Sequence, residues 1–371
     1  MGNRIKVLSI FGTRPEAIKM APLIKEFEHR ALEFESIVAV TAQHREMLDQ
    51  VLDVFQIQPD FDLNMMKQSQ SLAQITTSAL NGLDEIMKKV NPHLVLVHGD
   101  TSTTFAASLA AFYNEIPLGH VEAGLRTYNK YSPFPEEMNR QLTGVLADFH
   151  FAPTERAKLN LLREDKREED IYITGNTAID ALKTTITSTY SHPILNKLKN
   201  DRLLLLTAHR RENLGKNLTS MFRAIKRLVQ EHEDIHVVYP VHLNPTVKKA
   251  ATELLGDDER INLIEPLSVN DFHNFMAKSH IILTDSGGIQ EEAPSLGIPV
   301  LVLRDTTERP EGIKAGTLKL AGTDEETIFE LANELLTNET MYHEMAKASN
   351  PYGDGEASKR IADIIAKNIK V

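Results

Sequence analysis

Short apolar runs alternate with longer amphipathic stretches along the whole chain. Runs rich in Val, Ile and Leu that are separated by helix-length segments are typical of βαβ units around a parallel sheet buried on both faces. In the first half the predicted strands are Ile5–Ile10, Ser36–Thr41, His93–His98, Leu118–Glu122, Phe149–Ala152 and Ile171–Thr174. Helical periodicity predicts helices at Glu16–Arg30, Arg45–Phe55, Leu72–Val90, Thr103–Asn114 and Glu136–Leu146. The pattern predicts one doubly wound α/β domain.

The alternation pauses at a polar stretch, Thr184–Asp201, whose composition favours a connection between domains. It then restarts with predicted strands at Leu203–Ala208, His236–Pro240, Ile261–Ile264, Ile281–Thr284, Val300–Leu303 and Leu318–Leu320. Gly353 and Gly355 interrupt the last helix, and the amphipathic segment Ala357–Ile369 is expected to cross back to the first domain. We therefore predict two Rossmann-like, doubly wound parallel-sheet domains. Residues 1–176, joined by the helix at 355–371, form the first domain, residues 177–350 form the second, and the active site is expected in a cleft between them.

Composition narrows the class of protein. A chain of 371 residues exceeds what one hydrophobic core usually supports, in agreement with two domains. Its net charge of −11 offers no global field for nucleic acid or an anionic membrane, so neither is an expected partner. The chain has no cysteine, which excludes disulfides, thiolate catalysis and cysteine-bound metal, and we expect no metal site. No signal peptide or membrane span is visible, and the expected location is the cytoplasm.

In open α/β sheets ligands bind at the carboxyl ends of the strands, where this chain places many polar residues. The first predicted strand is followed by Gly12-Thr13-Arg14-Pro15-Glu16, a turn into a helix, with Lys19 one helical turn later. A helix N-terminus flanked by Arg14 and Lys19 suits a phosphate group or the charge around it. The alternative is a capped turn with a surface arginine.

Carboxylates follow two neighbouring strands of the first domain. Asp100 has a structural alternative as the N-cap of the next helix. Glu122 has none, because a buried carboxylate at a strand end is costly unless a function keeps it there. Glu136 and Glu137, in the first turn of a later helix, fit either catalysis or stabilisation of the helix dipole.

The second domain repeats the arrangement with histidines. His209 and His242 each follow a predicted strand, although a lone histidine is more often a structural hydrogen-bonding group. Ser286-Gly287-Gly288 joins a strand to a helix through two glycines, which lets the backbone approach a pyrophosphate. The charged loop Arg304–Glu311, which contains Arg309, fits ribose or a second phosphate, or is a plain polar loop. Neither GxGxxG nor a Walker loop is present, so a dinucleotide cofactor is not indicated.

Taken in order, these segments resemble the non-hydrolysing UDP-N-acetylglucosamine 2-epimerase family across nearly the whole chain. The matching segments are FGTRPEAIKMAPL, TAQHREML, VHGDT, HVEAGLRT, SPFPEEMNR, TGNTAIDAL, TAHRREN, YPVHLNP, LTDSGGIQEEAPSLG, RDTTERPEG and NPYGDGEAS. The resemblance implies a glycosyltransferase-B type fold, a homodimer, and UDP-N-acetylglucosamine and UDP as ligands. It implies an active site formed by Arg14, Lys19, Asp100, Glu122, Glu136, His209, His242, Ser286, Gly287, Gly288, Glu292 and Arg309, with Phe272 near the uracil.

Members of this family can bind a second substrate molecule at a regulatory site. The resemblance places that effector site at Gln43, Gln70, Glu136 and Arg210, whereas Ser69 departs from the arginine that some relatives carry.

The residues suit inversion at C2 by elimination and readdition of UDP. The C2 proton has no adjacent carbonyl, so it becomes acidic only when the C1–O bond breaks, and its loss gives 2-acetamidoglucal. Asp100, Glu122 and Glu136 would move protons, His209 would act on the leaving phosphate, and no redox cofactor is needed. A hydrolysing epimerase, a glycosyltransferase of the same fold and a non-enzymatic nucleotide-sugar sensor are the alternatives.

Overall fold

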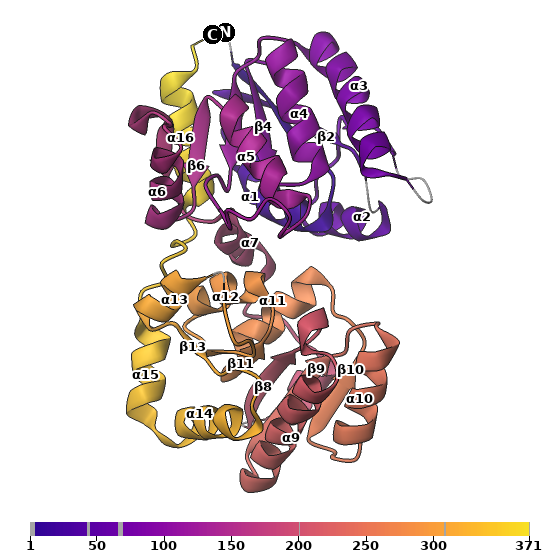
Figure 1. Ribbon diagram of the computed structural model, residues 1–371, viewed down its shortest axis with the longest axis vertical. Coiled ribbons are helices and arrows are strands. Elements are labelled where there is room, and N and C mark those ends of the chain that lie inside the picture. Colours follow the sequence, from indigo (N-terminus) through magenta and orange to yellow (C-terminus); the bar gives the residue numbers. More distant parts are fainter. Residues whose placement is uncertain (1–3, 43–44, 66–69, 200, 308, 371) are drawn as a thin grey trace. The chain divides into compact units, whose positions relative to one another are not determined.

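The computed structural model describes residues 4–42, 45–65, 70–199, 201–307 and 309–370. The chain forms two compact units, Met1–Thr184 with Tyr352–Val371, and Thr185–Pro351. Each unit is a parallel sheet with helices on both faces, which confirms the predicted α/β class (Figure 1). The first unit extends past residue 176, so helix α7 (Thr177–Thr185), which the sequence assigned to the second domain, packs almost wholly within the first.

Within the described residues the first unit has a seven-stranded sheet in the order β3-β2-β1-β4-β5-β6-β7, with every pairing parallel. Its strands are β1 (Ile5–Phe11), β2 (Phe34–Val40), β3 (Phe61–Asp62), β4 (Leu94–His98), β5 (Leu118–Val121), β6 (Phe149–Ala152) and β7 (Ile171–Ile173). The apolar positions of β1 and β4 are buried, as expected for central strands covered on both faces. The sequence did not predict β3, because a two-residue edge strand leaves no apolar run.

Helices cover both faces of this sheet. They are α1 (Arg14–His29), α2 (Arg45–Val54), α3 (Leu72–Val90), α4 (Ser102–Tyr113), α5 (Glu136–Leu146), α6 (Glu155–Arg163), α7 and α16 (Ala357–Asn368), with a short 3₁₀ turn at Glu168–Asp170. The start of α3 is fixed by a capping box, in which Ser71 and Gln74 exchange hydrogen bonds between side chain and backbone. Helix α16 packs against α1 and buries Ile361 and Ile365.

The second unit has its own parallel sheet, which in the described part of the chain is six-stranded with the order β10-β9-β8-β11-β12-β13. The strands are β8 (Arg202–Thr207), β9 (Ile235–Pro240), β10 (Ile261–Ile264), β11 (Ile281–Thr284), β12 (Val300–Val302) and β13 (Leu318–Leu320). Its helices are α8 (Pro193–Leu198), α9 (Lys216–Glu231), α10 (Pro245–Leu255), α11 (Val269–Lys278), α12 (Gly287–Glu292), α13 (Pro310–Ala315), α14 (Glu325–Thr337) and α15 (Glu339–Lys347), with 3₁₀ turns at Arg211–Asn213 and Ala293–Leu296. Helix α8 lies inside the stretch predicted as a polar connection.

The strand order reverses once in each sheet. In the first unit the chain moves outward from β1 on both sides, so the connections after β1 and β4 lead to opposite sides of the sheet. The loops after β8 and β11 do the same in the second unit. These two switch points are where a parallel α/β sheet positions its ligands.

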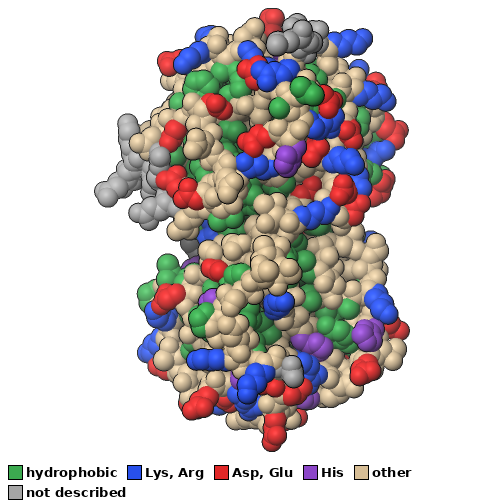
Figure 2. Space-filling model, turned by 180° about the vertical axis from the view of Figure 1, so that it is seen from behind, with side chains coloured by type: hydrophobic (Ala, Val, Ile, Leu, Met, Phe, Trp, Pro, Cys, Tyr) green, Lys and Arg blue, Asp and Glu red, His purple; other side chains and the backbone are tan. Residues whose placement is uncertain are grey.

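The surface does not segregate charge by sign on the face seen in Figure 2, where acidic and basic side chains intermingle over the first unit. Many form ion pairs, such as Arg30 with Asp363 and Lys158 with Glu168. Among the helices of the described residues, none has the length and apolar content of a membrane-crossing segment.

Candidate active site

A buried carboxylate joins the two loops of the switch point in the first unit. Oε2 of Glu16 accepts hydrogen bonds from the backbone N–H groups of Gly12 at 3.0 Å and Thr13 at 2.8 Å. Its Oε1 accepts the hydroxyl of Thr101 at 2.7 Å, from the loop after β4. Gly12 has no room for a side chain, because an added Cβ would lie 2.1 Å from Oγ1 of Thr41. Glu16 therefore fixes the backbone on which Arg14 and Asp100 stand.

Asp100 is not the N-cap of α4, which corrects the structural alternative drawn from the sequence. Thr101 is the N-cap, and its hydroxyl accepts the N–H of Thr104 at 3.1 Å. The Asp100 carboxylate is thus not used by the helix start. Its backbone oxygen accepts a hydrogen bond from Nδ2 of Asn139 at 3.0 Å, which ties the loop to α5.

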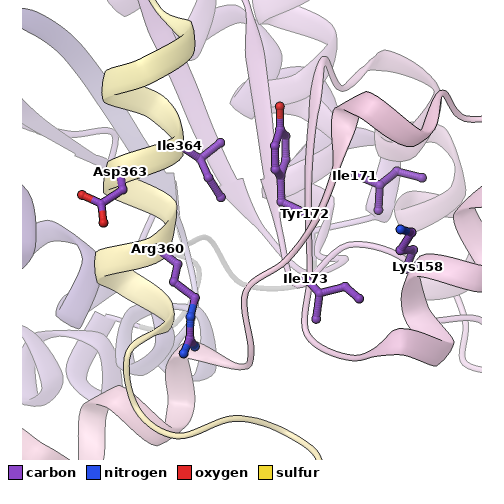
Figure 3. Close-up of a pocket in the computed structure, with 7 residues that line it drawn as sticks. All are labelled: Lys158, Ile171, Tyr172, Ile173, Arg360, Asp363 and Ile364. Atoms are coloured by element: carbon purple, nitrogen blue, oxygen red, sulfur yellow. The ribbon is translucent and has the colours of Figure 1, made fainter.

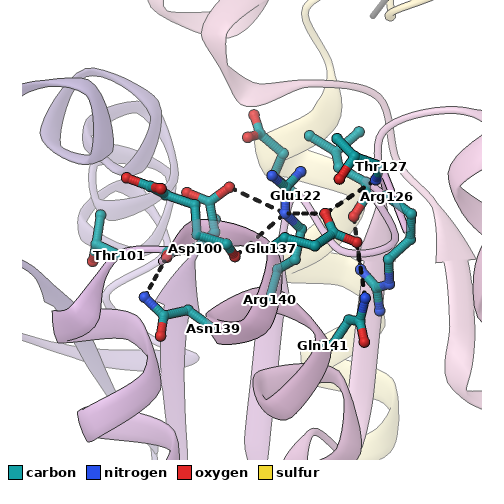
Figure 4. Close-up of polar contacts among 12 residues, drawn as sticks. Asp100, Thr101, Glu122, Arg126, Thr127, Glu137, Asn139, Arg140 and Gln141 are labelled. Carbon is teal, nitrogen blue, oxygen red and sulfur yellow. Dashed lines mark hydrogen bonds and ion pairs between the residues drawn. The ribbon is translucent and has the colours of Figure 1, made fainter. Parts of the chain in front are cut away.

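The environment of Asp100 favours its protonated form. Burial raises the pKa of Asp100 to about 6, against the opposing effect of Arg140, and the charge of Glu122 raises it further. Nε of Arg140 lies 3.5 Å from Asp100 and 3.3 Å from Glu137, so this cation is shared between two carboxylates (Figure 4). A carboxyl group with a pKa near 6 can both give and take a proton near neutral pH.

Glu122 follows β5 and remains ionised in the same region. Its carboxylate forms an ion pair with Nζ of Lys19, lies 3.5 Å from Nε2 of His98 and accepts Nδ2 of Asn176 at 3.3 Å. Burial alone would raise the pKa of Glu122, but the charges of Lys19 and His98 hold it well below its usual range. The backbone of Glu122 has φ of 63°, a left-handed conformation that is strained in a residue with a side chain. Strain of this kind is concentrated at functional sites.

The two neighbouring glutamates at the start of α5 have different roles. Glu137 is fully buried and accepts the backbone N–H groups of Thr127 and Tyr128 at 3.0 Å each, which makes it a structural anchor. Glu136 is half-buried, and its carboxylate has no hydrogen bond among the residues that the structure describes. Its charge acts on Asp100 and contributes to the raised pKa of that group. Of the pair, Glu136 alone is available for catalysis.

Arg14, the first residue of α1, supplies a cation to the same edge of the sheet. Burial lowers the pKa of its guanidinium, and within the described residues it forms no ion pair. A half-buried cation that is not paired with a carboxylate, and that lies beside the N-terminus of a long helix, suits an anionic ligand. Arg14 therefore fits the predicted phosphate contact, whereas Lys19 is paired with Glu122.

A second buried carboxylate joins the switch-point loops of the other unit. Oδ2 of Asp285, directly after β11, accepts the backbone N–H groups of His209 and Arg210 at 2.8 Å each. The loop that carries the predicted catalytic histidine is thereby attached to the loop that carries Ser286, Gly287 and Gly288. Neither the role of Glu16 nor that of Asp285 was predicted. Their positions next to a strand were the only visible signal.

The two histidines of the second unit lie together. Their rings are stacked with centroids 5.5 Å apart and planes 11° from parallel. Burial lowers the pKa of His209, and the neighbouring Arg210 and His242 lower it further against the charge of Asp285. His209 is therefore mainly neutral at pH 7. Nδ1 of His242 accepts the backbone N–H of Asn244 at 3.1 Å, which leaves its proton on Nε2.

Arg309 lies over the glycine turn of this unit. An added Cβ on Gly287 would lie 3.1 Å from the guanidinium carbon of Arg309, so a larger residue would require the guanidinium to shift by a few tenths of an ångström. Nε of Arg309 donates to Oε1 of the buried Glu291 at 2.8 Å, which holds the cation in place. Backbone N–H groups and an anchored guanidinium together suit a diphosphate.

The remaining predicted site residues are distributed around these centres. Glu292 ends α12, and its Oε2 lies 3.8 Å from Nε2 of His273. Half-buried Phe272 is the neighbour of that histidine on α11. Arg210 is half-buried, whereas Gln70, in the first unit, directly precedes the cap of α3. Gln43 and Ser69 lie outside the described residues.

The first unit also has a hollow away from the switch point. A cavity of about 450 Å³ lies between the edge strand β7, α6 and α16 (Figure 3). Its charged lining groups are already paired: Lys158 with Glu168, Arg360 with Asp354, and Asp363 with Arg30. This cavity therefore offers no unpaired charge to a polar ligand.

Two parallel α/β sheets, one with carboxylates of shifted pKa at its switch point and one with an anchored guanidinium over a glycine turn, define a Rossmann-type α/β protein with the features of an enzyme site. A sequence model described as UDP-N-acetylglucosamine 2-epimerase matches residues 25–366. A UDP-N-acetylglucosamine 2-epimerase of Bacillus subtilis is 66% identical over 361 residues, covering 97% of this chain and 95% of that protein. The chain belongs to the UDP-N-acetylglucosamine 2-epimerase family.

Solved structures agree with this assignment. One of a UDP-N-acetylglucosamine 2-epimerase is 64% identical, with a TM-score of 0.92, and the match covers 98% of this chain and 96% of that one. The enzyme from Neisseria meningitidis, bound to UDP-GlcNAc, is 52% identical with a TM-score of 0.87, covering 98% of this chain and 100% of the other. The fold is thus of the glycosyltransferase-B type that these enzymes share.

Proposed function

We propose that this chain interconverts UDP-N-acetylglucosamine and UDP-N-acetylmannosamine without releasing the sugar. The observation that carries the proposal is the pair Asp100 and Glu122, which follow neighbouring strands and have pKa values shifted in opposite directions. One carboxyl group titrates near neutrality while the other stays ionised. Such a division suits an acid and a base acting on one proton. The family membership and the UDP-GlcNAc bound to the Neisseria relative support the choice of substrate.

The reaction proceeds by elimination and readdition. The C1–O bond to UDP breaks with its electron pair on the phosphate oxygen, and C2 loses its proton to a carboxylate, which leaves 2-acetamidoglucal. Readdition returns UDP to C1 and a proton to the opposite face of C2. Asp100, Glu122 and Glu136 carry the protons and stabilise positive charge at C1, and His209 assists the leaving phosphate.

The groups that hold the nucleotide come from the predicted binding residues. Arg14 and Arg309 neutralise the diphosphate, and the backbone of Gly287 and Gly288 donates to it. Phe272 is assigned to the uracil. Lys19, His242, Ser286 and Glu292 complete the binding set. Lys19 in this scheme holds Glu122 ionised, and this chemistry needs neither a metal nor a redox cofactor.

The same family membership favours a cytoplasmic homodimer with a regulatory nucleotide-sugar site that involves Gln43, Gln70 and Arg210. For the dimer there is support on the surface of the first unit. Phe112 and Tyr113 at the end of α4 and Val145 on the adjacent α5 are 61%, 63% and 67% exposed. A group of large apolar side chains this exposed is typical of a surface that another protein covers.

Product analysis in heavy water tests the reaction. The protein is incubated with UDP-N-acetylglucosamine alone, and the products are analysed by mass spectrometry and NMR. The expected product is UDP-N-acetylmannosamine with deuterium at C2, because the C2–H bond must break. Free N-acetylmannosamine with UDP would instead show a hydrolysing epimerase. An absolute requirement for an acceptor would show that the protein is a glycosyltransferase. Unchanged substrate would favour the non-enzymatic nucleotide-sugar sensor.

A further inference from the structure

The two oxygens of the Asp285 carboxylate are used unequally. Oδ2 accepts the N–H groups of His209 and Arg210 at 2.8 Å each, and Nδ2 of Asn213 at 3.1 Å. Oδ1 has no hydrogen bond to any of the residues that the structure describes. Asp285 is 0% exposed, and a buried carboxylate oxygen without a hydrogen-bond donor is costly. A donor from the protein would remove this cost.

The side chain of His209 stands at the right place to be that donor. Its Nδ1 lies 3.2 Å from Oδ1 of Asp285. The backbone N–H of the same residue is already bound to Oδ2 of Asp285, so the carboxylate that holds the main chain of His209 also faces its ring. A hydrogen bond from Nδ1–H to Oδ1 would satisfy the buried oxygen and define the orientation and the tautomer of the ring.

We propose that Asp285 is a positioning residue that fixes His209 as the Nδ1–H tautomer and directs Nε2 to the phosphate of the substrate. This role rests on the proposed function, in which His209 assists the leaving group. When Nε2 carries a proton, the Asp285 carboxylate stabilises the imidazolium, and the proton passes from Nε2 to the phosphate oxygen as the C1–O bond breaks. Readdition of UDP returns the proton to Nε2, so the cycle is balanced.

The surroundings of His209 explain why such a carboxylate is needed. Burial, Arg210 and His242 all lower the pKa of His209, and the Asp285 charge is what opposes them. Without that charge, the imidazolium would be harder to form. Among the causes of this shift, Asp285 alone acts in the direction of protonation.

The neighbouring His242 provides an internal reference. Its Nδ1 accepts a backbone N–H, so its ring is expected as the Nε2–H tautomer, the opposite of His209. The two stacked histidines should therefore give different ¹⁵N signatures in the same sample.

The first test is the tautomer of His209 in the intact protein labelled with ¹⁵N-histidine. Long-range ¹H–¹⁵N spectra identify the protonated nitrogen of each ring, and the His209→Asn variant assigns the signal among the 14 histidines. We expect Nδ1–H for His209, a change to Nε2–H in Asp285→Asn, and no change for His242. An Nε2–H ring in the unmodified protein would overturn the proposal. This measurement does not need activity, so it decides the contact even if Asp285→Asn does not fold.

The second test is a double-mutant cycle on kcat with UDP-N-acetylglucosamine. Asp285→Asn is expected to lower kcat by roughly 10²- to 10⁴-fold, the range found when a histidine loses its orienting carboxylate or a general acid is lost. In the His209→Asn background the same change should cost less than about 3-fold, because the residue acts through the ring. Equal losses in both backgrounds would show a structural role and contradict the proposal.

The matched control is Asn213→Ala, which removes a donor to Oδ2 and leaves Oδ1 untouched. Asn213 also donates to the backbone oxygen of Leu303 at 3.1 Å, so its loss should lower Tm. The tautomer of His209 and kcat should stay near those of the unmodified protein. If this variant reproduces the losses of Asp285→Asn, loop attachment rather than ring orientation explains both. If the unmodified protein makes no UDP-N-acetylmannosamine, the proposed function fails and the NMR result stands alone.

Discussion

Lys19 of α1 and Glu122 after β5 form an ion pair in which the two side chains are only 16% and 11% exposed. Both charges are poorly exposed to water, so each is stabilised by the other. Removing one partner of a buried pair is more damaging than removing both.

We therefore expect Glu122→Gln to destabilise the protein by about 3 kcal/mol, because Lys19 loses its ion pair with Glu122 at a poorly solvated position. The double variant Lys19→Met with Glu122→Gln should recover much of this loss while remaining inactive. Urea unfolding of the three proteins measures the difference. A double variant no more stable than Glu122→Gln would show that the pair is not the source of the effect.

Asp100→Asn should have the opposite effect on stability. The pKa of Asp100 is raised from 3.8 to about 6, so the folded state binds its proton more tightly and ionisation disfavours folding. The amide should therefore raise the free energy of unfolding by about 1 to 3 kcal/mol above pH 6, with the gain shrinking toward pH 4 and absent below it. The same variant should lose roughly 10²- to 10⁴-fold in kcat. Unfolding curves at pH 4 and pH 8 separate this from a structural role, which would lower stability at pH 8.

Glu136 and Glu137 form a matched pair for separating catalysis from structure. Glu136→Gln should lower kcat at least 10²-fold with an unchanged Tm, because its carboxylate supports no described hydrogen bond. Glu137→Gln should lower stability by about 2 kcal/mol. Oε1 of Glu137 accepts hydrogen bonds from Tyr128 and Gln141, and an amide nitrogen placed there could not accept either of them. Thermal unfolding and initial rates of both variants test the assignment. A large loss of kcat in Glu137→Gln together with a lower Tm in Glu136→Gln would reverse the two roles.

Glu16 should be more tolerant of glutamine than its burial suggests. Within the described residues, Oε1 receives only hydroxyl groups, from Thr101 and Thr104, and hydroxyls can accept from an amide nitrogen as well as donate. Glu16→Gln should lower the free energy of unfolding by about 1 kcal/mol. Glu16→Ala leaves the N–H groups of Gly12 and Thr13 without this acceptor and should lower it by about 3 kcal/mol or more. Comparable losses in the two variants, measured by urea unfolding, would show that the carboxylate charge is required.

The sequence predicted most of the fold because buried parallel strands leave uninterrupted apolar runs. The bounds of β6, β10, β11 and β13 agree with the predicted runs, and the other predicted strands differ by one or two residues at their ends. Some elements had no predicted counterpart, and two of them show why. The edge strand β3 is too short for periodicity to register, and α8 lies in a segment whose average composition is that of a loop, although His192 and Pro193 mark its start.

The location of a candidate residue was predictable where it depends on its place after a strand, as for Asp100 after β4 and Glu122 after β5. A residue's role was not predictable where it depends on a partner far away in the chain. The contact of Glu16 with Thr101 spans 85 residues, and that of Asp285 with the backbone of His209 spans 76. The role of Lys19 belongs to this second kind: nothing near it in the sequence indicates that it meets Glu122.

The position of α16 has a consequence for synthesis on the ribosome. Its apolar face, with Ile361 and Ile365, covers α1 in the first unit, and Asp180 accepts the N–H of Ser358 at 2.7 Å at its start. The segment that contains α16 is translated only after all of the second unit, which is a continuous stretch of chain. During translation the second unit can therefore complete its core first, while the first unit keeps an uncovered apolar surface on α1 for a chaperone to protect.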